Sequence, residues 1–497
     1  MTPAKEIVES VAVTYPVIIT LIAPFLVYAF RKDPNKREAV SFIAAMATFL
    51  CVLSMAPEVL AGRILKYTVF TIMPGITVSF SADGLSMIFG MVSSFLWFIA
   101  TSYNIGYMRG LKEHAQTRYY VCFAVAILGA QGVSFASNVF TLYLFYEIIT
   151  VFTYPLVAHH QDEEAYSGAR KYLVYLVGTS KVFLLPAMVL TYILCGTLDY
   201  HLGDMTKGMY PSDANGLLVT VTYALFIAGI AKAAIMPFHN WLPSAMVAPT
   251  PVSALLHAVA VVKAGVFCIC RVILSGFGLD TMDRLGLGLP TAYIAAFTIV
   301  AASIIAITKD DLKARLAYST VSQLSYVVLG VTMLTPIAVQ GGMLHIANHA
   351  FSKITLFFTA GAIYVATHTK SISQMKGYGW RMPWTFGAFG IAALSMIGVP
   401  PVCGFVSKWY MVNGAVTIHQ MPLLIALLAS TILNVGYFVP VLYTAFFKSP
   451  DPGSHVEQYS EAPATMVVPL FFTAIVSVLL GLYPEAVTQF IKIFGGM

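Results

Sequence analysis

The sequence predicts an all-α polytopic membrane protein with about 14 transmembrane helices, including two inverted five-helix repeats in which helices 7 and 12 are broken. Composition is the first reason: 58% of the 497 residues are hydrophobic and 10% are charged, whereas about 25% of a soluble domain is charged. The second reason is a series of long apolar runs, and the third is that two of these runs carry proline beside lysine. Such a chain cannot cover itself with polar surface, so lipid must surround it.

The apolar runs have the length that a membrane requires. A bilayer core of about 30 Å is crossed by roughly 20 apolar residues in a helix. Runs of this kind lie near residues 9–30, 39–62, 84–107, 119–135, 138–158, 171–195, 217–238, 252–275, 289–307, 315–334, 340–366, 384–410, 421–447 and 463–485. We group them as N-terminal helices 1–3 (1–110), a first five-helix repeat (119–275), a second five-helix repeat (289–447) and a C-terminal helix 14 (463–497).

Residues 65–83 do not fit the helical pattern. The segments beginning at Tyr67 and Ile76 alternate apolar and polar residues, which is typical of strands. We therefore expect a small external β-hairpin between the second and third helices.

The distribution of lysine and arginine predicts the orientation. One side of the predicted helices holds Arg31, Lys32, Lys36, Arg37, Arg109, Lys112, Arg118, Arg170, Lys171, Lys309, Lys313, Arg315, Lys370, Lys376, Arg381 and Lys448. The other side holds only Lys5, Arg63, Lys66, Lys207, Arg271, Arg284 and Lys492. Because cytoplasmic loops carry the excess of basic residues, we expect both termini on the outside.

Six charged residues lie inside predicted spans: Lys181, Lys232, Lys263, Lys353, Lys408 and Glu147. A charge at mid-bilayer costs at least about 2.5–3.5 kcal/mol, so a chain keeps such groups when they are paired, hydrated or useful. Some could instead reach an interface or hold helices together, Lys181 above all. A buried lysine tends to lose its proton and a nearby carboxylate restores the charge. A Lys–Glu pair that forms and breaks would therefore move protons along a row of titratable groups.

Histidines extend this row. His345, His349 and Lys353 are spaced i, i+4 and i+8, so they lie along one face of a single helix and indicate a proton relay. Paired histidines also ligate heme, but usually from two helices, and His257 is the one other strong candidate. His257 and Lys263 are six positions apart, about 240° around a helix, so we expect them to face different neighbours.

Prolines interrupt two predicted spans beside a lysine. One interruption runs from Lys232 to Pro237, and the other runs from Gly398 through two prolines to Lys408. Proline removes a backbone donor, and freed backbone groups are tolerated in a membrane only where protein or water satisfies them. The breaks fall in spans seven and twelve. Interrupted helices at matching positions of inverted repeats indicate an ion site.

The chain has no visible means of driving transport itself. It has no Walker-type phosphate loop, no dinucleotide fingerprint and no cysteine set for iron–sulfur clusters. Its six cysteines are scattered without metal-ligand spacing: Cys51, Cys122, Cys195, Cys268, Cys270 and Cys403. We expect no cofactor, no metal site, no redox centre and no nucleic-acid partner, with the driving energy supplied by a partner subunit or an ion gradient.

Four segments carry a family resemblance: residues 237–265, 309–326, 348–353 and 398–408. They resemble the antiporter-like subunits, which comprise proton-pumping subunits of respiratory complex I, Mrp-type cation/proton antiporter subunits and their counterparts in membrane-bound hydrogenases. The resemblance covers roughly residues 80–450 and implies fourteen spans with inverted five-helix repeats.

The resemblance also implies residue roles. Glu147 and Lys232 match the family's switching pair, and Lys263 matches its central relay lysine. His257 matches a relay or gating histidine.

The remaining matches lead towards the exit. His345, His349 and Lys353 match the family's polar axis, and Lys408 matches the terminal lysine. Some members carry glutamate at that last place, so lysine favours the Mrp D-type and hydrogenase-type branches. Lys181 matches no assigned role, and neither does the pair at residues 159–160.

The implied function is translocation of protons, with or without exchange for a cation such as sodium, within a redox-driven pump or an Mrp-type antiporter. The implied setting is a prokaryotic inner membrane, with other membrane subunits as partners, including further antiporter-like subunits. Two other functions stay open. A stand-alone secondary solute transporter would need a substrate pocket with few titratable groups, and a quinone-contacting membrane subunit would need a quinone site.

Overall fold

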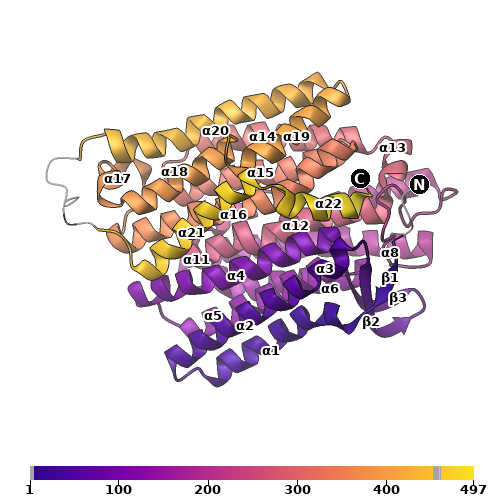
Figure 1. Cartoon of the computed structure of the whole chain (residues 1–497), viewed down its shortest axis with the longest axis horizontal. Helices are drawn as coiled ribbons and strands as arrows, with labels where there is room; N and C mark the ends of the chain where they lie inside the picture. The colour runs from indigo at the N-terminus through magenta and orange to yellow at the C-terminus, as the bar shows by residue number, and fades with distance from the viewer. Residues whose placement is uncertain (1–4, 451–457, 459, 497) are drawn as a thin grey trace.

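The computed structural model describes residues 5–450, 458 and 460–496. Long helices lie side by side along the long axis, and both ends of the chain lie at one end of this bundle (Figure 1). Within the described residues, eleven helical segments are long and apolar enough to cross a membrane, and the apolar helices α9 (Gly216–Gly229) and α18 (Pro383–Ile397) are shorter. The all-α polytopic membrane fold is confirmed, whereas the number of crossings and the inverted repeats stay predictions.

Each apolar run overlaps a helix. The first eight runs overlap α1 (Tyr15–Ala29), α2 (Pro34–Ser54), α4 (Gly84–Gly110), α5 (Gln116–Phe135), α6 (Val139–Val157), α7 (Glu163–Thr179) with α8 (Leu185–Cys195), α9, and α11 (Thr250–Ala254) with α12 (Val261–Arg271). The last six overlap α14 (Gly288–Ile307), α15 (Leu312–Thr332), α16 (Pro336–Thr367), α18 with α19 (Cys403–Thr417), α20 (Met421–Phe447) and α21 (Ala464–Leu482). Short helices α3 (Ala56–Leu60), α10 (Trp241–Ser244), α13 (Leu279–Arg284), α17 (Tyr378–Arg381) and α22 (Glu485–Gly495) complete the set.

Side-chain caps fix where several of these helices begin. Asp33, Asn138 and Asp162 accept hydrogen bonds from backbone N–H groups in the first turns of α2, α6 and α7. These N–H groups have no partner within the helix, so a cap at the preceding residue stabilises the start.

The segment near 65–83 forms the expected hairpin. β2 (Ile64–Met73) pairs antiparallel with β3 (Ile76–Ala82), and β1 (Ile7–Glu9) pairs parallel with β2. Gly75 at the turn has a φ of +77°, which glycine adopts without strain. The sheet lies at the end of the bundle where the two chain ends meet (Figure 1).

A buried ion pair ties α12 to the segment that follows the sheet. The Arg271 guanidinium donates to both carboxylate oxygens of Asp83, at 2.6 and 2.9 Å, and both side chains are buried. Asp83 also accepts from the Ser86 N–H and so caps α4. Arg271, counted among the basic residues of the outer side, therefore has its charge satisfied inside the protein.

The centre of the bundle is α16. It packs against α4, α11, α12, α15, α18, α19 and α21, and almost all of its side chains are buried. By contrast, α1, α14 and α20 expose large apolar side chains such as Phe25, Phe297 and Ile432, as lipid-facing helices do. The titratable residues on α16 therefore lie in the protein interior.

Candidate functional site

The first predicted break follows α9 and carries Lys232. A 3₁₀ turn covers Ala231–Ala233, and side chains from neighbouring segments satisfy its backbone. The Trp241 indole N–H donates to the Ala231 carbonyl at 3.0 Å, and the Lys232 N–H donates to the Tyr146 hydroxyl at 3.3 Å. The break is thus held by protein groups, as a membrane interior requires.

The fully buried Lys232 side chain binds α6. Its Nζ donates to the Tyr146 carbonyl at 2.8 Å and to Thr150 Oγ1 at 2.6 Å, and it lies 3.1 Å from the centroid of the Tyr146 ring. On the other side, Gly265 of α12 allows close packing, because a Cβ there would lie 2.3 Å from the Lys232 carbonyl carbon. Lys232 is therefore held between α6 and α12.

Glu147, the next residue on α6, is paired with a different lysine. Lys181 Nζ lies 3.5 Å from Glu147 Oε2 and donates to the Tyr143 hydroxyl at 2.5 Å. Among the described residues, Lys232 forms no ion pair, and Glu147 Oε1 has no hydrogen-bond partner. The expected Glu147–Lys232 pair is not in contact, because Lys232 reaches the preceding residue, about 100° around α6.

The second predicted break separates α18 from α19. α18 ends at Ile397, and Gly398 takes a left-handed φ of 94°. Lys408 Nζ donates to the Met396 carbonyl at 2.6 Å and to the Ile397 carbonyl at 3.1 Å. These carbonyls lack a helical partner, and a cation at a helix C-terminus is favoured by the helix dipole. Lys408 therefore caps the helix segment that ends at the break.

Lys263 and His349 join α12 to α16. Lys263 Nζ lies 2.6 Å from His349 Nδ1, and both side chains are fully buried. One turn earlier on α16, His345 Nδ1 lies 2.8 Å from Ser407 Oγ and its Nε2 lies 3.1 Å from Gln323 Oε1. Since Ser407 belongs to α19, this contact connects the central pair to the second break.

His345, His349 and Lys353 form a stripe along one face of α16. The third of them, Lys353, faces α15. Its Nζ donates to Ser319 Oγ at 2.9 Å, and Ser319 Oγ also accepts from the Tyr437 hydroxyl at 3.2 Å. The residues of the stripe therefore contact three neighbouring elements, which makes α16 the hub of the buried polar groups.

His257 lies on a π-helical turn, Leu255–Val259, just before α12. Its ring lies 4.6 Å from that of Phe357 on α16, and neither ring nitrogen has a hydrogen-bond partner among the described residues. His257 and Lys263 thus both reach α16, but at different residues, Phe357 and His349. A π turn contains more residues than an α turn, so the angle between the two side chains differs from the α-helical value.

The neutral groups that bind the buried charges were not predicted from the sequence. They are Tyr146, Thr150, Ser319, Gln323 and Ser407. The sequence spacing could have indicated four of these residues, because they form two pairs. Tyr146 and Thr150 are i, i+4 beside Glu147, and Ser319 and Gln323 are i, i+4 on α15, so each pair shares one helix face.

A cavity of about 650 Å³, here called the vestibule, opens at the bundle end opposite the sheet. Thr250, at the start of the helical stretch that carries His257, and Ala360 of α16 line it. Its charged and titratable lining includes Glu113, His160, Asp162, Asp311, Lys313 and Lys370. The vestibule therefore provides a polar approach to the helices that carry the buried row.

Two groups of the vestibule have shifted pKa values. Burial lowers the pKa of His160 below its ordinary value. Burial acts to raise the pKa of Glu113, but the interaction with His159 and the charges of His160, His159 and His114 outweigh it and lower the pKa. The Glu113 carboxylate is therefore held in its charged form beside three histidines.

Comparison with known proteins gives a consistent relationship. Residues 136–434, more than half of the chain, match the family model described as NADH:quinone oxidoreductase/Mrp antiporter, TM. The chain is 31% identical to NADH-quinone oxidoreductase subunit N of Desulforudis audaxviator, over 95% of this chain and 96% of that protein. It is 29% identical to Na(+)/H(+) antiporter subunit A1 of Staphylococcus haemolyticus, over 96% of this chain but only 61% of that protein.

Two solved structures share the fold. A chain of the Mrp complex from Dietzia sp. DQ12-45-1b matches with a TM-score of 0.86 and 18% identity, over 98% of this chain and 97% of that chain. A chain of the membrane-bound sulfane sulfur reductase, an archaeal respiratory membrane complex, matches with a TM-score of 0.87 and 24% identity over the same shares. Together with the sequence matches, these findings show that the chain belongs to the NADH:quinone oxidoreductase/Mrp antiporter family of antiporter-like membrane subunits.

Proposed function

We propose that the chain translocates protons, with or without exchange for a cation, along its buried Lys/His/Glu row as a subunit of a multi-subunit membrane complex. The observation that supports this most is the 2.6 Å contact between Lys263 Nζ and His349 Nδ1 in the protein interior. Two positive charges at this distance would repel strongly in a low dielectric. The pair therefore carries a proton that either nitrogen can hold, which is what a relay requires.

The row continues on both sides of this pair. His345 and His349 have ring centroids 5.9 Å apart, and Ser407 links His345 to the segment that carries Lys408. His349 Nε2 and both ring nitrogens of His257 lack a protein partner among the described residues. Buried polar atoms are usually satisfied by protein or ordered water, so we expect internal water to complete the proton path at these atoms.

Glu147 supplies a candidate switch, because its charge acts on both Lys181 and Lys232. In the structure it is engaged with Lys181. A shift of the carboxylate towards Lys232 would favour the charged form of that lysine, and its return would favour proton release. The pair-switch is thus an exchange of Glu147 between two lysines.

The complex and its orientation are part of the proposal. The relatives are named as subunits of NADH-quinone oxidoreductases and of a Na(+)/H(+) antiporter, and we extend membership of such an assembly to this chain, with other antiporter-like subunits as partners. We place it in a prokaryotic inner membrane with both termini outside. The start of α2, which carries Arg37, and the end of α4, which carries Arg109, lie at the opposite end of the bundle from the two chain ends (Figure 1), which supports this orientation.

The test is transport by the whole complex, purified from its own membranes and reconstituted into liposomes with a pH-sensitive dye. Lys263→Ala should abolish coupled proton movement while the subunits still purify together. Lys448→Ala, an exposed lysine outside the row, is the matched control and should transport at the wild-type rate. Unimpaired transport by the Lys263→Ala complex would refute the proposal. So would a chain that purifies alone and moves an organic solute without a proton requirement.

A further inference from the structure

Four side chains of the types that bind metal ions lie at the rim of the vestibule, outside the buried row. Glu113 and His114 lie in the loop between α4 and α5, and His159 and His160 follow α6. About 45 residues separate the two pairs, and the fold brings them together at the basic-rich end of the bundle.

The ligand atoms of Glu113, His114 and His159 lie close together, and His160 approaches the same Glu113 carboxylate. Glu113 Oε2 lies 3.6 Å from His159 Nε2, 3.9 Å from His114 Nδ1 and 3.9 Å from His160 Nδ1. One ligand atom each of Glu113, His114 and His159 lies within 4.8 Å of the others. Ligand atoms bound to a tetrahedral zinc ion at about 2.0–2.2 Å lie about 3.3–3.5 Å apart. Movements of a few tenths of an ångström up to about 1 Å would therefore close the set around an ion.

His159 is the observation that a structural role does not explain. Its side chain is fully buried, yet neither ring nitrogen has a hydrogen-bond partner among the described residues. Nε2 points towards the Glu113 carboxylate, beyond hydrogen-bond distance. Buried polar side chains are nearly always satisfied, so we expect the ring nitrogens of His159 to have a further partner outside the described residues.

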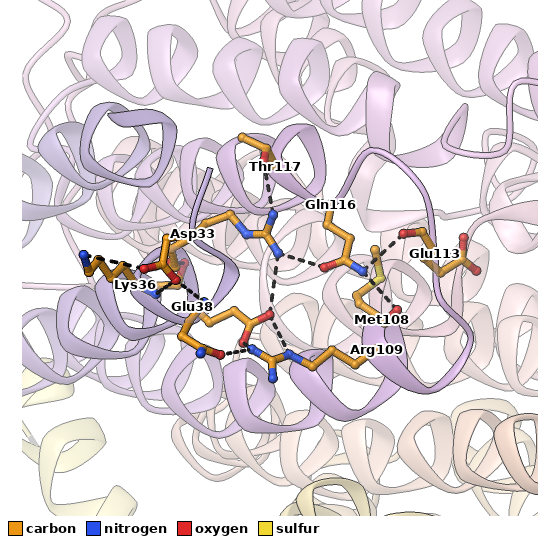
Figure 2. Close-up of polar contacts among 11 residues, drawn as sticks. Asp33, Lys36, Glu38, Met108, Arg109, Glu113, Gln116 and Thr117 are labelled. Atoms are coloured by element: carbon orange, nitrogen blue, oxygen red, sulfur yellow. Dashed lines mark hydrogen bonds and ion pairs between the residues drawn. The ribbon is translucent and has the colours of Figure 1, made fainter. Parts of the chain in front are cut away.

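The two loops are held in place by contacts that leave the ligand atoms free. The Gln116 amide donates to the backbone carbonyls of Met108 and Glu113, both at 3.2 Å. Figure 2 shows the Glu113 carboxyl pointing away from the contacts between Glu38 and Arg109. On the other loop, Arg118 donates to the His159 carbonyl at 2.9 Å. The backbone is therefore fixed while the side chains remain available.

We propose that Glu113, His114 and His159, with His160 beside them, form a binding site for one divalent transition-metal ion of the zinc class. Two imidazoles and one carboxylate, with a third imidazole beside them, suit zinc and its neighbours, whereas calcium and magnesium prefer oxygen ligands. The half-exposed His114 and His160 give the ion a path from solvent.

The site also bears on transport, and this part rests on the proposed function. Glu113 and His160 line the vestibule, so a bound ion would place positive charge at its mouth. That charge would repel protons entering from this end, and zinc should therefore slow transport.

The binding test uses the purified complex, stripped with EDTA and titrated with zinc, with bound zinc counted by mass spectrometry. His114→Ala and Glu113→Gln should each remove one zinc per chain or weaken its binding at least about tenfold, since even outer-shell partners of metal sites contribute roughly 10–100-fold. His201→Ala, an exposed histidine at the opposite end, is the control and should bind as the wild type does. Neither altered side chain makes a hydrogen bond among the described residues, so we expect both variants to assemble, which co-purification of the subunits checks.

The results of these experiments distinguish the metal site from its effect on transport. Equal zinc binding by the wild type and both ligand variants would overturn the site. Zinc that binds at the site but slows wild-type and His114→Ala transport equally would overturn the link to the vestibule. Loss of transport in Lys263→Ala is measured without zinc, so failure of the proposed function is distinguishable from failure of the metal site.

Discussion

The two helix breaks each hold a buried lysine, but the two lysines are bound in different ways. Lys408 donates to the Met396 and Ile397 carbonyls, so it closes the end of the helix segment just before it. Lys232 instead reaches across to α6, where it binds the Tyr146 carbonyl and the Thr150 hydroxyl. One lysine stabilises its own break, and the other couples its break to a neighbouring helix.

This difference separates a structural contribution from a switching one. The ammonium of Lys408 is satisfied by backbone that belongs to the same break, so its removal should loosen the fold there. Lys232 binds the residue next to Glu147 on α6, and the Glu147 carboxylate is paired with Lys181. In the proposed switch, the charge of Lys232 changes with the position of that carboxylate, so its removal should affect transport more than stability.

The largest effect is expected for Lys232→Ala. This change removes the lysine through which Glu147 would act, and transport in reconstituted liposomes should fall to the background of protein-free liposomes. Since Lys232 forms no ion pair among the described residues, its loss leaves no carboxylate without its partner, and the complex should assemble. Wild-type pumping by this variant would remove the basis of the comparison.

Lys408→Ala should be the more damaging change for stability. It leaves the Ile397 carbonyl without a donor, whereas Asn434 still donates to the Met396 carbonyl. A buried unsatisfied group costs about 1–3 kcal/mol. Thermal unfolding in detergent should therefore occur at a lower temperature for Lys408→Ala than for Lys232→Ala. The reverse order would show that both lysines serve the fold in the same way.

A smaller effect is expected for Thr150→Val, which keeps the shape of the side chain but removes the hydroxyl that accepts from Lys232. A hydrogen bond to a charged group is worth about 1.5–3 kcal/mol, so the transport rate should fall by roughly 10- to 100-fold. Thr220→Val is the control, because its hydroxyl bonds only within its own helix. Equal rates for the two variants would mean that the contact with α6 does not matter for transport.

The smallest effect is expected for Lys181→Ala. Its side chain is 49% exposed on the outside of the bundle, so it lies beside the buried row rather than within it. The transport rate should therefore fall by no more than about fivefold. Complete loss would make Lys181 an equal member of the switch, and the contrast between the two breaks would then involve three lysines.

The sequence predicted the features that depend on local pattern. Apolar length located the helices, alternation located the hairpin, and proline beside Lys232 and Lys408 located both breaks. The stripe of His345, His349 and Lys353 followed from helical periodicity. Each of these depends on residues close together in the chain.

The features that were missed depend on packing between distant segments. The partner of Glu147 is Lys181 rather than Lys232, and nothing in the spacing of the three indicates which contact forms. The π-helical turn at His257 changes the angle between successive side chains around the helix. No proline within the turn indicates this change in the sequence. Glu113 and His159 lie in loops about 45 residues apart, so their proximity has no counterpart in local sequence.

The length of α16 has an electrical consequence. His345 and Lys353 are eight residues apart, which is about 12 Å along a helix axis, or roughly 0.4 of a 30 Å hydrocarbon core. A proton that moves between them across the bilayer would experience that fraction of the membrane voltage, about 0.9 kcal/mol per 100 mV. The step from Lys263 to His349 crosses between helices instead. Membrane voltage should therefore act on proton steps along α16 and leave the step between α12 and α16 almost unaffected.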